Sequence, residues 1–274
     1  MKYNFVLDSS CELPEEIIKE INPTYVDFSV SINEKKIDKN ISNEELIKLL
    51  SESENPPTTA APSPGDFLNG IKKEGETFCV TISSKLSAAF QNANLAKNLF
   101  LEECKKNVHV FDSQSASAGE SLIVLKIKEY IDKGFNFNEI VEMVEKFIKN
   151  MRTYFVLDSI ENLRKNGRLS TIAGFVLELL SIKPVLSGQN GEIKLKAKAR
   201  GLKAAQKKLL DIVLEDKEKL DGATVVITHF NSEENANRLS EKIKQYTNVK
   251  DIYVLKTKLL SSVYADNGGI IISY

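Results

Sequence analysis

Short apolar runs rich in β-forming residues alternate along the chain with longer segments in which apolar residues recur every three or four positions. This alternation is typical of a parallel sheet whose strands are joined by helices packed on its faces. In the first half we expect strands at 3–7, 77–82 and 108–111, a small hairpin at 25–30 and 35–37, and helices that begin at Pro14, Ser42 and Ser63 or span 88–103, 116–132 and 138–151.

The second half carries more hairpin signals, which favour a mixed sheet. The chain has 274 residues, and at roughly 150 residues per domain this length favours two domains. We therefore predict an α/β protein with an N-terminal domain at 1–155, built on a mainly parallel sheet, and a C-terminal domain at 156–274, built on a mixed sheet. A strand expected at 154–157 lies at the boundary. The expected strands of the C-terminal domain are 184–186, 193–197, 223–228, 251–255 and 270–274, and its expected helices are 159–165, 171–180, 202–214 and 233–245.

A proline-rich loop interrupts the first half at residues 53–65, which hold four of the seven prolines. Proline fixes φ and pushes the preceding residue toward an extended conformation, so we expect a stiff loop that holds Thr59 in a defined place. Ser63, Pro64 and Asp66 then form a helix start, with a capping serine and proline at the first helical position.

Charge and composition exclude several classes of protein. The chain has 37 Lys and Arg against 38 Asp and Glu, so no overall field draws it to nucleic acid or to an anionic membrane. We expect no nucleic-acid partner. No run of about 18 apolar residues predicts a membrane span, and the N-terminal apolar triplet is too short for a signal peptide. The three cysteines have unrelated spacings, which indicates free thiols and a cytoplasmic location.

Familiar catalytic motifs are missing from the sequence. His109 and His229 lie in or at the end of separate predicted strands, and neither CxxC nor HExxH spacing occurs, so no catalytic metal is expected. The turn after the first strand reads DSSCELP and lacks the glycines of a nucleotide-binding loop. No GxSxG elbow is present either. We accordingly predict that the protein needs no cofactor.

An Asp-Ser pair follows three of the predicted strands: FVLDS occurs at 5–9 and 155–159, and VFDS at 110–113. Ligands of open α/β sheets bind beyond the carboxyl ends of the strands, so these pairs could rim a site. A small-molecule phosphotransferase or hydrolase that uses them is therefore one functional hypothesis. In the other interpretation, which is the commoner one for such residues, Asp and Ser only cap the next turn or helix.

Hydroxyl groups at a helix start suggest an anion site. After the strand at 77–82 a helix opens near Ser87, followed by Ala88 and Ala89. Small side chains let an oxyanion approach the free N–H groups of the first turn, where the helix dipole favours negative charge. Thr59 could add a second hydroxyl to a bound carboxylate or phosphate. Ser87 could equally be an ordinary helix cap.

A basic segment lies at residues 161–168, where Asn166-Gly167 predicts a tight turn with positive φ. Such a turn would present Arg168 outward on a rigid corner. Arg200 lies in a second basic segment. The segment is either a solvated turn or a docking face for an acidic partner. A protein-interaction module is therefore a third hypothesis.

Together these segments resemble the DegV family of bacterial fatty-acid-binding proteins, which includes the B subunit of fatty acid kinase. The resemblance spans essentially the whole chain. It rests on the order of Asp8-Ser9, the segment 59–64 with Phe67, the segment 82–87, Asp112-Ser113 with Ser117 and Gly119, then 162–168, 182–186, 191–193, 199–201 and Gly268.

The resemblance implies a long-chain fatty acid buried between two α/β domains, in a carrier that is not an enzyme. Residues around the carboxylate would be Thr59, Ala60, Ser87, Ala88 and Tyr264. Tyr264 stands where the family usually has a histidine, and a phenol can also hydrogen-bond an oxyanion. The family further implies that Arg168 and Arg200 dock a separate ATP-binding kinase subunit, which phosphorylates the carried acid.

Overall fold

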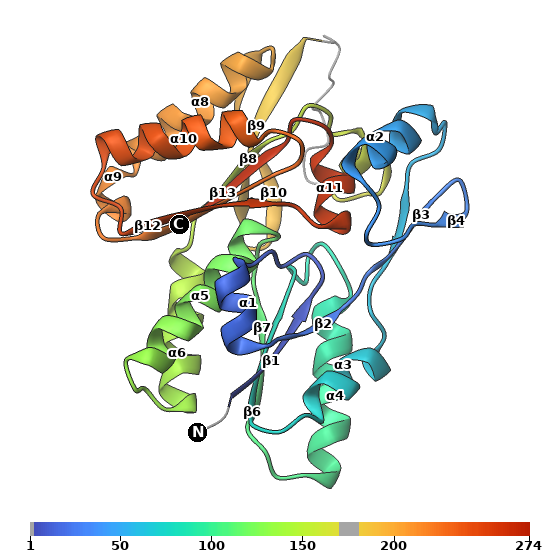
Figure 1. Ribbon diagram of the computed structural model, residues 1–274, viewed down its shortest axis with the longest axis vertical. Helices are drawn as coiled ribbons and strands as arrows, with labels where there is room; N and C mark the ends of the chain where they lie inside the picture. The colour runs from blue at the N-terminus through green and yellow to red at the C-terminus, as the bar shows by residue number, and fades with distance from the viewer. Residues whose placement is uncertain (1–2, 170–180) are drawn as a thin grey trace.

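The computed structural model describes residues 3–169 and 181–274, which form two sheets with helices around each, one above the other in Figure 1. The helix predicted at 171–180 lies outside the described residues. Both sheets follow the predicted fold class. The lower sheet is parallel throughout and the upper one is mixed, so the α/β prediction is confirmed.

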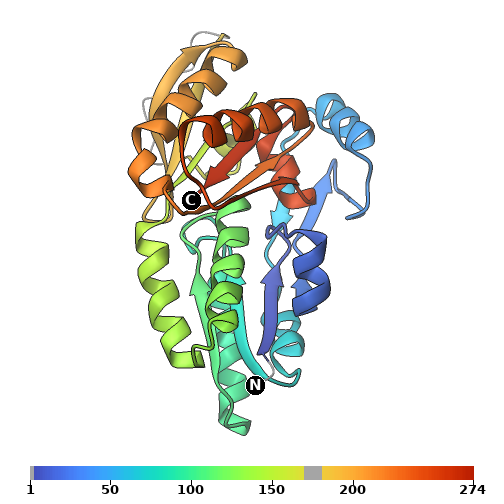
Figure 2. The same cartoon turned by 60° about the vertical axis from the view of Figure 1, so that its left-hand side comes forward.

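The N-terminal sheet has the strand order β2-β1-β6-β7. Helices α5 and α6 cover one face, where the buried aromatic side chains of β6 and β7 pack, and α3 and α4 cover the other (Figures 1 and 2). The elements are β1 (Tyr3–Asp8), α1 (Glu15–Ile21), β2 (Thr24–Val26), α3 (Pro64–Ile71), β6 (Glu76–Thr81), α4 (Ala89–Glu103), β7 (Val108–Asp112), α5 (Ala118–Asp132) and α6 (Phe137–Asn150).

The C-terminal sheet has the order β10-β9-β8-β13-β11-β12, and only β11 and β12 pair in parallel. Helices α8 and α10 pack on one face through a large apolar cluster (Figure 1). The elements are β8 (Thr153–Val156), α7 (Glu161–Lys165), β9 (Ile182–Gln189), β10 (Glu192–Arg200), α8 (Leu202–Glu215), α9 (Lys217–Leu220), β11 (Thr224–His229), α10 (Glu233–Tyr246), β12 (Asp251–Lys256), α11 (Leu259–Ala265) and β13 (Ile270–Ser273).

A small third sheet, with the order β4-β3-β5, joins the C-terminal core although it comes from the first half of the chain. Its elements are β3 (Ser29–Ile32), β4 (Lys35–Lys36) and β5 (Thr58–Ala60), accompanied by α2 (Asn43–Glu52). Val30 and Leu46 pack in one cluster with Phe155 and Leu157, which places this unit beside α11 (Figure 1).

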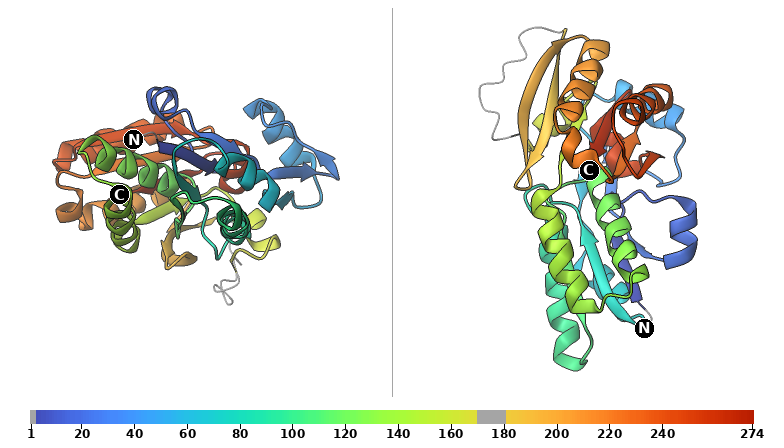
Figure 3. Two further views of the ribbon diagram at one scale, coloured as in Figure 1. Left: turned by 90° about the horizontal axis from the view of Figure 1, so that it is seen from below. Right: turned by 90° about the vertical axis from the view of Figure 1, so that its left-hand side faces the viewer.

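Helix α5 runs along the lower sheet, and its first turns reach the upper sheet (Figure 3). Its first half is buried on every side, and Ala118 and Leu122 pack against Val226 of the upper sheet. This contact joins the two halves along α5. No helix in the described part of the chain is long and apolar enough to cross a membrane.

Residue 155, the predicted end of the N-terminal domain, lies within β8, whose four residues all belong to the upper sheet. The division into two domains stays a prediction. The strand predicted at 25–30 is two strands in different sheets, because β2 pairs with β1 and β3 pairs with β5. The short elements β5, α9 and α11 were not predicted. None of them shows a clear periodic pattern, since each is only three to seven residues long.

Candidate functional site

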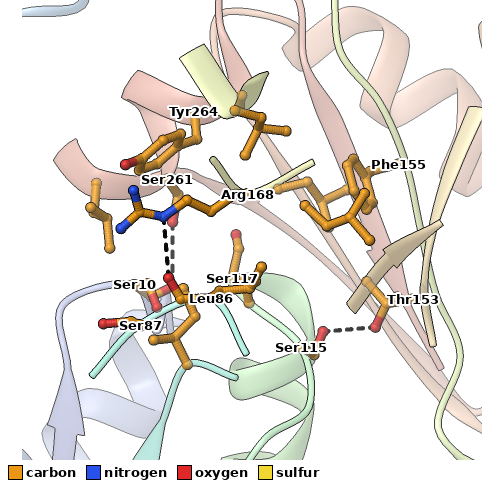
Figure 4. A pocket seen from close by; sticks show the side chains of 18 of the residues that line it. Ser10, Leu86, Ser87, Ser115, Ser117, Thr153, Phe155, Arg168, Ser261 and Tyr264 are labelled. Atoms are coloured by element: carbon orange, nitrogen blue, oxygen red, sulfur yellow. Dashed lines mark hydrogen bonds between the residues drawn. The ribbon is translucent and has the colours of Figure 1, made fainter. Parts of the chain in front are cut away.

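A cavity of about 310 Å³ lies between the two large sheets, under the small sheet and α11 (Figure 4). Its volume falls in the range of small-molecule sites, roughly 300–1,000 Å³. Most of its wall is apolar, and the polar side chains gather at its two ends and along one side. The apolar lining consists of Phe28, Ala61, Ile82, Leu86, Ala116, Phe155, Leu157, Leu163, Ile193, Leu260, Ala265 and Ile271.

Two hydroxyl groups meet at one end of the cavity, which we call the head end. The Thr59 Oγ1 and Tyr264 Oη atoms lie 2.9 Å apart, and both side chains are half-buried. Thr59 comes from β5, which pairs with β3, and Tyr264 comes from α11. The head end therefore depends on the small sheet being held against α11.

Ser87 and Ala88 complete the head end at the start of α4. The predicted helix start is confirmed within two residues, with Ala88 as the cap and Ser87 one position earlier. The Ser87 Oγ accepts a hydrogen bond of 3.2 Å from the Ala89 N–H group. Because α4 has 15 residues, the positive end of a long helix dipole faces this part of the cavity.

Ala60 is placed differently from its neighbours. Its side chain is exposed, and the cavity is lined by Thr59 and Ala61 instead. Alternate residues of an extended segment face opposite sides, so Thr59 and Ala61 cannot share a side with Ala60. The expectation that Ala60 takes part in the site through its side chain is therefore not met.

Arg168 points inward and not outward as predicted. The predicted turn is present, since Gly167 has a φ of 75°. However, the Arg168 Nε donates a hydrogen bond of 3.2 Å to the Leu86 carbonyl (Figure 4), and its Nη1 donates one to the Asn166 carbonyl. The guanidinium therefore lies at the cavity wall, where two carbonyl oxygens hold it. Arg200 is exposed at the end of β10, outside the cavity.

The opposite end, which we call the far end, is also polar. The Ser115 Oγ and Thr153 Oγ1 atoms lie 2.8 Å apart, and Thr153 also bonds the Ser273 Oγ at 2.9 Å. Figure 4 shows this pair on the side of the cavity away from Tyr264 and Arg168. Gln114 and Gly188 close the wall next to the pair.

Three hydroxyls along one side of the cavity are backed by buried carboxyl groups. Ser10 bonds Asp8 and Glu120, while the Ser117 Oγ donates to Glu12 Oε2 at 2.7 Å. Ser261, from α11, is the third hydroxyl.

Glu12 joins the two halves of the molecule, because its Oε1 accepts a 3.1 Å bond from the Lys258 N–H group. Burial raises the pKa of Glu12 to about 7 and that of Glu120 well above its usual range. These two glutamates could not be predicted as part of the site, since nothing in the local sequence distinguishes a buried glutamate from an exposed one.

The Asp-Ser pairs serve mainly as loop supports. Asp8 Oδ2 accepts a bond of 2.7 Å from the Ile82 N–H group, and Asp112 Oδ1 accepts one of 3.0 Å from the Ser84 N–H group. Ser159 Oγ accepts from the N–H group of Glu161 at the start of α7. These bonds fit the capping interpretation. Among the described residues, no carboxylate of the three Asp-Ser pairs lines the cavity, and the Glu192 carboxylate, which does, is paired with the Lys194 ammonium at 2.6 Å.

Within residues 3–169 and 181–274, no group of three or more His, Cys, Asp or Glu side chains could hold a metal ion. The two histidines have separate partners. His109 Nε2 lies 2.9 Å from Glu145 Oε1, and His229 Nδ1 accepts from the Ser232 N–H group at 3.3 Å.

Curated relatives cover the whole chain. A DegV domain-containing protein from Streptococcus pneumoniae strain R6 is 32% identical over 280 residues, which is 100% of this chain and 99% of the relative. A DegV domain-containing protein from Streptococcus pyogenes serotype M18 is 33% identical over 280 residues, which again cover 100% of this chain and 99% of the relative.

Solved structures have the same architecture. A DegV family protein from Ruminococcus gnavus, refined with vaccenic acid, is 36% identical, with a TM-score of 0.94 over 100% of this chain and 99% of that one. The Streptococcus pneumoniae Fatty Acid Kinase B3 protein, loaded with linoleic acid, is 30% identical, with a TM-score of 0.87 over the same shares.

The family model described as "Uncharacterised protein, DegV family" matches residues 2–274. The match leaves out only the first residue, and it agrees with the full-length relatives in sequence and in fold. The chain belongs to the DegV family.

Proposed function

We propose that the protein binds a long-chain fatty acid in the cavity between its two sheets, with the carboxylate at the head end and the acyl chain toward the far end. The observation that carries this proposal is the pairing of an apolar cavity with Thr59, Ser87 and Tyr264 at one end. Family members similar to this chain were solved with vaccenic acid and with linoleic acid, which supports the same ligand class here.

The two parts of such a ligand need different surroundings, and the cavity offers both. Each buried CH₂ group contributes about 0.8 kcal/mol, so the apolar wall gives affinity without any catalytic group. A carboxylate removed from water must be hydrogen-bonded, and bonds to a charged group are worth about 1.5–3 kcal/mol each. Thr59, Ser87 and Tyr264 supply donors for it. The Arg168 guanidinium adds a positive charge to the same end.

The protein would then act as a carrier and not as an enzyme. In this role it presents the acyl carboxylate to a separate ATP-binding fatty acid kinase subunit, as its likeness to the Fatty Acid Kinase B3 protein suggests. Arg168 and Arg200 are the residues that we propose for docking that subunit. The cytoplasmic location stays a prediction.

Lipid analysis of the purified protein tests the proposed ligand. Native mass spectrometry of the chain expressed in bacteria should show a mass increment of one fatty acid, and solvent extraction should remove it. A folded preparation that stays free of fatty acid, even after incubation with oleate or palmitate, would refute the proposal.

The docking role needs a separate test, because Arg168 also lines the cavity. Arg200 is exposed and outside it, so Arg200→Glu should reduce capture of the ATP-binding subunit while the bound lipid is retained. Lys242→Glu, an exposed charge reversal on α10, is the matched control. Equal capture by the wild type and Arg200→Glu would remove Arg200 from the docking surface.

A further inference from the structure

A second cavity, of about 480 Å³, lies behind the far end of the first. The two cavities share three lining residues, namely Gln114, Thr153 and Gly188, so the wall between them is thin. Their linings differ in character. The second cavity is lined mostly by polar and charged side chains from the end of α6, from β8, β9 and β10, and from the end of α8.

Positive charge predominates in this second cavity. Lys149, Arg152 and Lys196 line it, against the single carboxylate of Asp216. That carboxylate is already engaged, because its Oδ2 lies 3.7 Å from the Arg152 Nε and accepts a bond of 3.3 Å from the Tyr274 hydroxyl. Among the described residues, no carboxylate lies within ion-pair distance of Lys149 or Lys196.

Ser187 provides an independent indication of a ligand. Its side chain is 1% exposed and lines the second cavity but not the first. The alternation along β9 explains this, since Leu186 packs in the apolar cluster beside the first cavity and Ser187 faces the other side. The Ser187 Oγ has no hydrogen-bond partner among the described residues. Buried hydroxyls almost always have a hydrogen-bond partner, and a ligand oxygen at this place would provide one for Ser187.

We propose that this second cavity binds a phosphate group, either as free phosphate or as part of a small phosphomonoester. Three cations, from α6, from the connection between α6 and β8, and from β10, can surround a dianion, which suits phosphate better than a carboxylate of single charge. The Ser187 hydroxyl can donate to one of its oxygens. Hydrocarbon is disfavoured, because it would displace water from the Lys149 and Lys196 ammonium groups without offering them a partner. This site is independent of the fatty acid proposed for the first cavity.

Calorimetric titration of the full-length chain at constant ionic strength tests the proposal, with inorganic phosphate and methyl phosphate as separate probes. We expect saturable binding at one site. Tighter binding of methyl phosphate would assign the phosphomonoester, and tighter binding of inorganic phosphate would assign the free ion. In the double variant Lys149→Ala, Lys196→Ala the affinity should fall by at least about tenfold. Ser187→Ala should weaken it by roughly fivefold.

A charge-matched control distinguishes a specific phosphate site from nonspecific electrostatic attraction of phosphate to the protein. The double variant Lys203→Ala, Lys207→Ala removes two exposed lysines from α8 and should bind phosphate as the wild type does. The absence of saturable binding up to about 10 mM phosphate, equal weakening in both double variants, or an unchanged affinity in Ser187→Ala would each overturn the proposal.

Discussion

Thr59 and Tyr264 are 205 positions apart in the sequence, and their hydroxyl groups form a hydrogen bond of 2.9 Å at the head end of the cavity. One residue belongs to a short strand of the first half and the other to a short helix of the second half. The bond brings together two hydroxyls that would otherwise be unrelated. When a carboxylate binds, the hydrogen bond between the two hydroxyls can be replaced by bonds to the ligand. Each hydroxyl can rotate and donate its proton to a carboxylate oxygen.

The double variant Thr59→Ala, Ser87→Ala should weaken fatty acid binding by at least about tenfold, because two hydrogen bonds to a charged group are lost. Both side chains are only half-buried, so the fold should persist. A fluorescent fatty acid displacement assay measures the affinity, and circular dichroism checks the fold. Thr58→Ala changes an exposed neighbour in the same strand and serves as the control. An unchanged affinity in the double variant would place the carboxylate elsewhere.

Tyr264→Phe should weaken binding by at least about tenfold, the effect of losing one hydrogen bond of about 1.5 kcal/mol or more to a charged group. Tyr264→His keeps a donor at this position and should bind more tightly than Tyr264→Phe. The same displacement assay ranks the three proteins. If Tyr264→Phe binds as tightly as the wild type, the phenol hydroxyl only supports Thr59 and does not contact the ligand.

Gly188→Leu should shorten the acyl chain that the protein prefers. A Cβ atom at this position would lie 3.5 Å from the Thr153 Cβ, an ordinary contact, so the backbone tolerates a side chain. The remaining carbons of leucine would then occupy the far end, and each CH₂ that no longer fits would cost about 0.8 kcal/mol. Competition among saturated acids of increasing length measures the preference. Gly188→Ala is the control and should keep the profile of the wild type, whereas an unchanged profile in Gly188→Leu would place the methyl end elsewhere.

Stability should fall as the pH rises from about 4.5 to about 7, because Glu12 has a pKa of about 7 in the folded protein against 4.5 ordinarily. Between these values the folded state keeps a proton that the unfolded state has lost, so raising the pH favours unfolding. The loss of unfolding free energy from Glu12 is up to about 3 kcal/mol. Burial raises the pKa of Glu120 and Asp8 too, which acts in the same direction.

Urea unfolding from pH 4.5 to pH 8 measures this dependence. In Glu12→Gln the titrating group is gone, and the free energy of unfolding should vary less with pH over this interval. A pH dependence equal to that of the wild type would show that Glu12 does not carry a raised pKa in the folded protein.

The alternating strands and helices could be predicted because each is long enough to show its own period. Helix α6 is an example, since its buried Phe137, Ile140, Val144 and Ile148 recur at helical spacing. The start of α3 could also be predicted, because Ser63 is the expected cap and Pro64 the expected first residue, and the structure adds a reciprocal bond from the Ser63 N–H group to Asp66.

What could not be predicted depends on contacts between distant segments. Strand β5 has only three residues and forms because it pairs with β3. No pattern in the local sequence indicates this pairing. Arg168 turns inward because the Leu86 carbonyl, 82 positions away, accepts from it. The order of motifs nevertheless predicted Thr59, Ser87, Ala88 and Tyr264 as carboxylate ligands, and all four line the cavity in the structure, although their role stays a prediction.

The most direct test of the carrier account is a crystal structure of the protein with a fatty acid that carries bromine on its terminal carbon. The account predicts a bromine anomalous peak at the far end, beside Ser115, Thr153 and Gly188, with the carboxylate oxygens within hydrogen-bond distance of Thr59 Oγ1 and Ser87 Oγ. A bromine peak beside Tyr264, or a ligand bound outside this cavity, would contradict it.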